Sequence, residues 1–164
     1  MEYFDLLDKH RNSLNRTLPR GTKLNEDEYN QGVEVWIISP SKKILITQRS
    51  SQKSHPLMWE TPGGCSVAGE NTLQTAYREI KEEIGLPIEK ENFKLISTQI
   101  YKQQFVDIYI VEADVNISDL NLQSDEIADA KLVTAQELEQ LIKDNKVVPC
   151  STQDYNAIKN LLNL

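Results

Sequence analysis

The clearest hydrophobic pattern in the chain is a helical one between residues 71 and 86. Its apolar residues fall three or four positions apart and form a single stripe: Leu73, Ala76, Tyr77, Ile80 and Ile84. Asn71 or Thr72 can cap the start of this helix, because short polar side chains accept hydrogen bonds from its free N–H groups. Gly85 and Pro87 end it.

Several other segments have the composition of β-strands. Gly32–Pro40 and Lys43–Gln48 are rich in β-branched residues and flank a turn at Ser39–Lys42, which predicts a hairpin. Further strands are predicted at Phe93–Tyr101, Phe105–Val115 and, more briefly, Lys131–Thr134. Two more segments have helical periodicity, Thr134–Asp144 and Thr152–Leu162.

The two ends of this pattern are less regular. Residues 1–31 alternate weakly, with a charged turn at Asp8–Asn12, and predict an accessory N-terminal hairpin or extension. Residues 49–70 contain glycine, proline and serine without a sustained period and are predicted to be mostly loop. Together the elements predict an α+β fold in which helices cover both faces of a mixed β-sheet, an α/β/α sandwich.

Composition adds limits to this picture. The 164 residues are expected to form a single domain spanning 1–164. The net charge of −7 argues against broad nucleic-acid binding, and no apolar run is long enough for a membrane span. The first residues lack the apolar core of a secretory signal, so we expect a cytoplasmic protein with Cys65 and Cys150 reduced.

Three carboxylates on the central helix are the first candidates for chemistry. Glu79, Glu82 and Glu83 are spaced i, i+3 and i+4, so they share one face of the helix. Like charges at this spacing repel, and they also crowd the negative end of the helix dipole. A hard divalent cation such as Mg²⁺ or Mn²⁺ would offset that repulsion. The alternative interpretation is an acidic helix face turned to water.

The residues around these carboxylates decide between the two interpretations. The run Gly64–Leu86 reads GCSVAGENTLQTAYREIKEEIGL and resembles the signature of the Nudix hydrolases, G-x5-E-x7-R-E-U-x-E-E-x-G-U, where U is aliphatic. All specified positions match: Gly64, Glu70, Arg78, Glu79, Ile80, Glu82, Glu83, Gly85 and Leu86. At average residue usage, a chance match is rarer than roughly one in a million.

The resemblance implies a Nudix fold and a set of roles. Glu79, Glu82 and Glu83 would be metal ligands, joined by the carbonyl of Gly64 or Gly63. Arg78 and Glu70 would order the loop and orient the carboxylates. The implied reaction is Mg²⁺- or Mn²⁺-dependent hydrolysis of a diphosphate linked to another moiety, by an activated water.

The resemblance leaves the general base open. Some family members use a glutamate of the helix, here Glu83, with Glu82 beside it, and others use one from a later loop. Glu126 lies in such an acidic loop, Ser124–Ile127, and is the candidate for a further ligand or base. An exposed loop acid is the alternative. The number of metal ions is equally open.

Residues before the signature are candidates for binding the substrate. Arg49, Lys53 and His55 can contact phosphate oxygens, although a solvated basic loop has the same composition. Trp59 is a candidate to stack on a ring of the substrate, although an aromatic residue at a strand margin more often packs in the core. Gly63 and Gly64 allow close approach of a phosphate to the backbone.

Three functions follow from the resemblance. The first is a hydrolase acting on a small nucleoside-type or other organic diphosphate. The second is an isopentenyl-diphosphate isomerase, which residues 3–8 and the run before the glycines resemble. Gly63 stands where those isomerases have a cysteine, which favours hydrolysis. The third is a non-catalytic ligand-sensing module, and the N-terminal hairpin is compatible with a homodimer. The substrate is not encoded in any motif that we identify.

Overall fold

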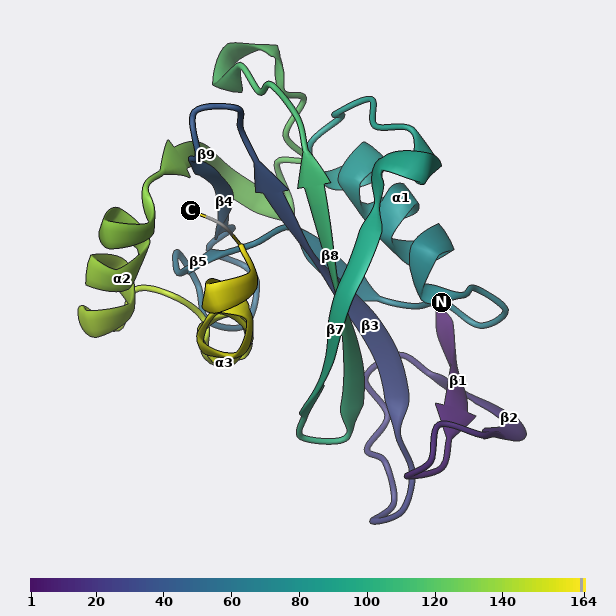
Figure 1. Cartoon of the computed structure of the whole chain (residues 1–164). Coiled ribbons are helices and arrows are strands. Elements are labelled where there is room, and N and C mark those ends of the chain that lie inside the picture. The colour runs from purple at the N-terminus through teal and green to yellow at the C-terminus, as the bar shows by residue number, and fades with distance from the viewer. Residues whose placement is uncertain (163) are drawn as a thin grey trace.

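The structure, a computed structural model, describes residues 1–162 and 164 and consists of a mixed β-sheet between two layers of helices (Figure 1). The helices are α1 (Thr72–Glu83), α2 (Ala135–Lys143) and α3 (Pro149–Ile158). Helix α1 covers one face of the sheet, while α2 and α3 lie on the other face (Figure 1). The predicted α+β sandwich is therefore confirmed.

Strand β3 is the centre of a seven-stranded sheet. It runs parallel to β8 over nine residue pairs and antiparallel to β6. Strand β7 pairs with the outer edge of β8, and β4 pairs with β5 and β9. The strands of this sheet are β3 (Asn30–Ile38), β4 (Ile44–Arg49), β5 (Trp59–Glu60), β6 (Gly63–Cys65), β7 (Lys94–Tyr101), β8 (Gln104–Glu112) and β9 (Ile127–Val133).

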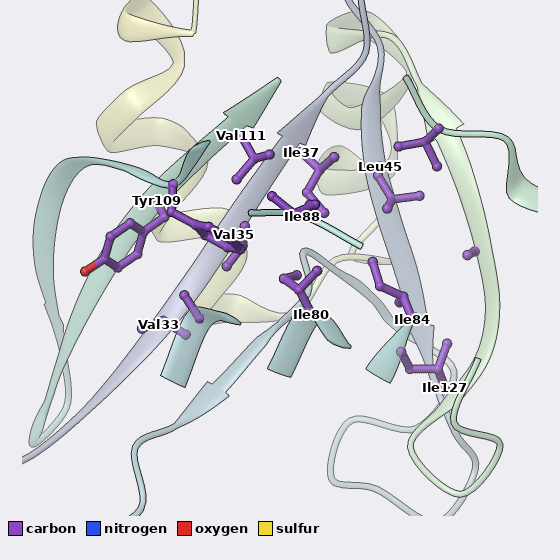
Figure 2. Packing of buried hydrophobic residues seen from close by; sticks show 14 residues of the cluster. Val33, Val35, Ile37, Leu45, Ile80, Ile84, Ile88, Tyr109, Val111 and Ile127 are labelled. Carbon is purple, nitrogen blue, oxygen red and sulfur yellow. The ribbon is translucent and has the colours of Figure 1, made fainter. Parts of the chain in front are cut away.

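Alternation along β3 builds a hydrophobic core on each face of the sheet. Val33, Val35 and Ile37 pack toward α1, where Ile80 and Ile84 complete the cluster shown in Figure 2. The intervening β3 residues point to α2 and α3 and pack against Tyr155, Ile158 and Leu138: they are Trp36 and Ile38. Successive side chains of a strand point to opposite faces, so one strand supplies both cores.

Helix α1 is held at both ends. The Asn71 side chain accepts a hydrogen bond from the Gln74 backbone N–H, and the Gln74 side chain accepts one from that of Asn71, each at 2.9 Å. Gly85 follows the helix with φ of +66°, a conformation that favours glycine. Its position against Asn121 leaves little room for a Cβ. These contacts fix the last helical turns, which carry the glutamates.

The N-terminal residues form a separate antiparallel hairpin of β1 (Tyr3–Leu7) and β2 (Ser13–Pro19). At its turn, Arg11 donates two hydrogen bonds of 2.8 Å to the Asp107 carboxylate on β8. The Ala68 N–H donates to the Tyr3 carbonyl at 2.8 Å. The hairpin is therefore attached both to the sheet and to the loop that precedes α1.

Some elements differ from the sequence prediction. Strands β3 and β4 pair directly only at Ile38 and Ile44, because β6 occupies the same edge of β3 at Gly32–Glu34 while β8 fills the opposite edge. Strand β9 begins at Ile127 rather than Lys131, since it runs along the whole of β4. Helix α3 begins at Pro149, which needs no N–H partner at a helix start. Within the described residues, no helix has the length and apolarity of a transmembrane segment.

Candidate active site

Arg78, on helix α1, is the centre of an ion-pair network. Its guanidinium donates to both Glu70 carboxylate oxygens at 2.8 and 3.0 Å, and to the Cys65 carbonyl at 3.3 Å. It also donates to Glu79 at 3.0 Å and Glu82 at 3.2 Å. These contacts, those to Glu70 first, raise the pKa of Arg78 and keep it charged. Arg78 therefore holds two helix carboxylates and the preceding loop in one arrangement.

Glu79 and Glu83 are buried against the paired glycines of β6. Glu79 is 8% exposed and lies so close to Gly64 that a Cβ there would overlap its carboxylate. Glu83 is 5% exposed and accepts a hydrogen bond from the Gly63 N–H at 3.3 Å. Burial, followed by repulsion from Glu79, raises the pKa of Glu83 to about 8. The helix thus directs two carboxylates at the glycine strand.

Glu82 differs from these two carboxylates. Its side chain is 55% exposed and contacts Arg78 at the edge of the helix. Among the described residues, one ligand atom from each of Glu34, Cys150 and Asp154 lies within 4.8 Å of the others. The carboxylate oxygens of the three helix glutamates are not gathered in this way. Repulsion between like charges, with Arg78 drawing Glu82 outward, accounts for this separation.

Lys53 brings the later acidic loop to the helix. Its ammonium nitrogen lies 2.5 Å from Oε2 of Glu126 and 4.0 Å from Oε1 of Glu83. The Ser50 N–H donates to the Glu126 carbonyl at 2.9 Å, and the Ser50 hydroxyl donates to the Asp125 carbonyl at 2.7 Å. The loops at 50–53 and 125–126 are therefore joined beside the last turn of α1.

A cleft of about 380 Å³ adjoins this arrangement. Three of the predicted phosphate contacts, Arg49, Lys53 and His55, line it together with Gly63 and Gly64. Two further basic residues that the sequence analysis did not select also line it, Arg20 and Lys102. An acidic protein thus collects cationic side chains at one cleft, as binding of an anion requires.

Arg49 is held in the cleft wall by Glu60. Its Nη1 lies 2.6 Å from Oε2 of Glu60, and its Nε donates to the Ser54 carbonyl at 2.6 Å. Burial raises the pKa of Glu60, and the charges of Arg49 and Lys53 oppose that shift. Arg49 therefore has one carboxylate partner already, whereas His55 is exposed at the rim with a positive φ of 55°.

Trp59 does not lie in the cleft lining. Its ring is buried in the core under α2 and α3, with the Lys131 ammonium 4.0 Å from the ring centroid. Trp59 therefore packs in the core, as an aromatic residue at a strand margin more often does, and it is not placed to stack on a ligand in the cleft. Strand β5 pairs with β4 at this residue, which turns the indole into the sheet rather than toward the glycines.

Several cleft residues have no signal in the sequence. Arg20 follows the N-terminal hairpin and reaches Gly64 and Cys65 only because that hairpin folds back on the loop before α1. Glu34 lies within an apolar strand, and Cys150 lies in the first turn of helix α3, far along the chain. Glu60 also lines the cleft, and its position just before Gly64 in the sequence could have marked it as a candidate.

The donors beside α1 fit a hard divalent cation. They are carboxylate oxygens only, from Glu79, Glu82 and Glu83, the ligand type that Mg²⁺ and Mn²⁺ prefer. The Glu79 carboxylate lies directly against Gly64, and a Cβ at position 64 would occupy the space of this carboxylate. The ammonium of Lys53 already places a positive charge near Glu83 and Glu126.

Comparison with known proteins agrees with this geometry. The NUDIX domain family model matches residues 28–152. An uncharacterized Nudix hydrolase of Listeria monocytogenes is 33% identical over all of this chain and 95% of its own length. An isopentenyl-diphosphate delta-isomerase of Aspergillus fumigatus is 27% identical, over 73% of this chain and 54% of its own.

A solved structure shows the same fold. DR0079 from Deinococcus radiodurans superposes with a TM-score of 0.75 at 18% sequence identity, covering 90% of this chain and 92% of its own. The chain belongs to the Nudix hydrolase family. It is a phosphohydrolase, an enzyme that acts on phosphorus-containing anhydrides.

Proposed function

We propose that the protein hydrolyses a diphosphate bond in a small nucleoside-type or other organic diphosphate, with Mg²⁺ or Mn²⁺ as cofactor. The observation that carries this proposal is the burial of Glu79 and Glu83 against Gly63 and Gly64, beside a cleft lined with cationic side chains. Two buried carboxylates that repel each other are stabilised by a cation, and a cationic cleft takes an anionic substrate.

Different residues of the chain would bind the metal and the phosphate groups. Glu79, Glu83, the Gly64 carbonyl and, after a change of rotamer, Glu82 would hold the metal. When bound, the metal neutralises charge on the diphosphate oxygens and lowers the pKa of water. Arg49, Lys53 and His55, which line the cleft, contact the phosphate oxygens.

A carboxylate takes the proton from the attacking water. Glu126 and Glu83 are the two candidates, and they face each other across Lys53. The water oxygen forms a bond to phosphorus while the bond to the bridging oxygen breaks, and the leaving phosphate takes the electron pair. Arg78 acts as a positioning residue, because its hydrogen bonds to Glu70, Glu79 and Glu82 hold the carboxylates.

Isomerisation of isopentenyl diphosphate is the second candidate function. It is supported by the similarity to an isomerase and by the Cys65 thiol, which lines the cleft and accepts a hydrogen bond from Gln104 at 3.0 Å. Hydrolysis has the stronger support, since all the specified positions of the hydrolase signature are present.

The test is a panel of nucleoside diphosphates and triphosphates, dinucleotides, sugar nucleotides and prenyl diphosphates, incubated with protein and Mg²⁺ or Mn²⁺. Release of phosphate or a monophosphate, with ¹⁸O from labelled water in the product, supports hydrolysis. Allylic rearrangement without release supports isomerisation. Tight binding without turnover on any compound supports the ligand-sensing alternative and contradicts the proposal. Glu126→Gln against Glu83→Gln then identifies the base, since loss of the base removes the acidic limb of the pH–rate profile.

A further inference from the structure

Two of the cationic side chains that line the cleft are already paired with acidic residues of the site. Arg49 lies 2.6 Å from Oε2 of Glu60, and both side chains of this pair are only 15% exposed. Lys53 lies 2.5 Å from Oε2 of Glu126. The proposed function assigns Arg49 and Lys53 to the diphosphate that is cleaved, and the protein itself supplies a carboxylate to each of them.

Arg20 and Lys102, the outer cations of the cleft, have weaker partners. Arg20 lies 2.6 Å from Oε2 of Glu2, but the two side chains are 54% and 52% exposed, so water screens this pair. Among the described residues, no carboxylate lies within 4.0 Å of the Lys102 ammonium, which stands 5.4 Å from the centroid of the Tyr101 ring. A protein of net charge −7 thus keeps two cations at its cleft without buried counter-charges.

The outer cations and Arg49 lie on opposite sides of Gly63 along the chain. Glu60, which pairs with Arg49, comes three residues before Gly63, and Cys65 comes two residues after it. Arg20 lies beside Cys65, because both line a small hollow next to the cleft. Five residues of extended chain span up to about 17 Å. The cleft therefore has room for a second anionic group beyond the diphosphate.

Lys102 lies at the same end of the cleft as Arg20. It stands in the turn between β7 and β8, two residues before Gln104. The Gln104 side chain donates a hydrogen bond of 3.0 Å to Sγ of Cys65. Both outer cations are thus close to Cys65, one from the N-terminal hairpin and one from the β7–β8 turn.

The floor of the cleft at this end suits the organic part of a substrate. Cys65, Gly32 and Val106 lie side by side across β6, β3 and β8, and Tyr101 also lines the cleft. The volume of about 380 Å³ is in the range of small-molecule sites. An organic moiety that leaves a diphosphate at the paired glycines and passes over Cys65 brings its far end to the outer cations.

We propose that Arg20 and Lys102 bind a second phosphate group, carried on the organic moiety of the substrate away from the diphosphate that is cleaved. The preferred substrates are then nucleotide-type diphosphates with a further phosphate on a sugar hydroxyl. This inference rests on the proposed function, because the diphosphate at the paired glycines fixes the orientation of the substrate. The phosphate replaces Glu2 as the partner of Arg20 and supplies the partner that Lys102 lacks.

Two matched pairs of compounds test the inference: ADP with a 3′-phosphate against ADP, and NADPH against NADH. In each pair, the first compound adds one phosphate on a ribose hydroxyl. Dissociation constants are measured by calorimetry with Ca²⁺, and kcat/KM with Mg²⁺. We expect the first compound of each pair to bind about tenfold or more tightly, the range of hydrogen bonds to a charged group. This preference should fall as the salt concentration rises.

The double variant Arg20→Gln, Lys102→Gln should lower the preference toward one. Both side chains are exposed, so these substitutions remove charge without changing the core. The double variant Lys94→Gln, Lys143→Gln is the matched control, because it makes the same change in net charge at exposed positions outside the cleft lining. The control should keep the preference, whereas an effect of net charge alone would lower it in both double variants.

Equal binding of the two compounds in both pairs, or a preference that the variant without the outer cations keeps, would overturn the inference. ATP against ADP tests a second anion in the phosphate chain itself. A gain for ATP that depends on the outer cations, with no gain from the ribose phosphate, would also overturn it. Hydrolysis without the preference would leave the proposed function standing. The preference without turnover of any compound would contradict the proposed function alone.

Discussion

The ammonium of Lys53 lies between two carboxylates from distant parts of the chain, 2.5 Å from Glu126 and 4.0 Å from Glu83. Glu83 ends helix α1, and Glu126 precedes strand β9. The Lys53 ammonium thus lies where Glu83, a proposed metal ligand, approaches the loop acid Glu126. A metal ion bound by Glu83 will compete with this ammonium group.

Lys53→Gln should make the enzyme saturate at lower Mg²⁺. We expect the half-activating Mg²⁺ concentration to fall about two- to tenfold, because the competing charge is gone. KM for the substrate should rise, since a phosphate contact is lost. Activity titrated with Mg²⁺ measures both effects. Lys102→Gln, which removes a lysine of the cleft lining outside the ion pairs with Glu83 and Glu126, is the control and should leave the Mg²⁺ midpoint unchanged. An unchanged midpoint in Lys53→Gln would show that this ion pair does not oppose the metal.

Glu83→Gln should lower kcat by several orders of magnitude. The amide keeps the size of the side chain but removes the charge that would hold the cation. Glu89→Gln, in the exposed loop after α1, is the control for loss of one acidic residue and should retain full turnover. Near-wild-type turnover of Glu83→Gln in excess Mg²⁺ would refute the assignment of Glu83 as a ligand.

Arg20→Ala should raise KM about tenfold with little change in kcat. Arg20 lines the cleft beside Gly64 and Cys65. Its guanidinium pairs with the exposed Glu2, and a phosphate oxygen of the substrate can replace that carboxylate. Arg16→Ala removes an arginine of the same hairpin that pairs with Glu28 instead. Steady-state kinetics on both variants provide the comparison. Equal KM values for wild type and Arg20→Ala would exclude a contact with the substrate.

The pair of Arg11 and Asp107 should make stability depend on acid pH. Burial acts to raise the pKa of Asp107, but hydrogen bonds from Arg11, Thr72 and Thr98 outweigh it and hold that pKa below its ordinary value of 3.8. A carboxylate with a lowered pKa stabilises the fold above its unfolded pKa, and this stabilisation is lost as pH falls through the folded pKa. The loss therefore occurs below pH 3.8.

Asp107→Asn tests this contribution. At pH 7 we expect its free energy of unfolding in urea to be about 1–3 kcal/mol lower than that of wild type. The difference should shrink as the pH is brought below 3.8, where wild-type Asp107 becomes protonated as well. Asp119→Asn, at an exposed position, should match wild type throughout. A difference that stays constant with pH would mean that the charge of Asp107 does not stabilise the fold.

The helix and the direction of its glutamates could be predicted from sequence because both depend on local rules. The apolar stripe of α1, its cap at Asn71 and the stop at Gly85 are set by neighbouring residues. The pairing of β3 could not be predicted in the same way. Residues 32–34 pair with β6, which lies about thirty residues further along the chain, beyond β4 and β5. Tertiary packing, rather than a local pattern, selects this partner.

The cleft shows the same division. Arg49, Lys53 and His55 lie near the signature in sequence and near it in space. Arg20 and Cys150 reach the same cleft from opposite ends of the chain, and no local pattern marks them. Trp59 shows the converse, since closeness in sequence to the glycines does not bring its ring to the cleft.

The most direct measurement is a crystal structure of the protein grown with Mn²⁺, with the metal located by its anomalous scattering. We expect Mn²⁺ within about 2.5 Å of carboxylate oxygens of Glu79 and Glu83 and beside the Gly64 carbonyl. Crystals of Glu83→Gln should lack this peak. Mn²⁺ found instead among Glu34, Cys150 and Asp154, with none beside α1, would show that α1 does not carry the metal site.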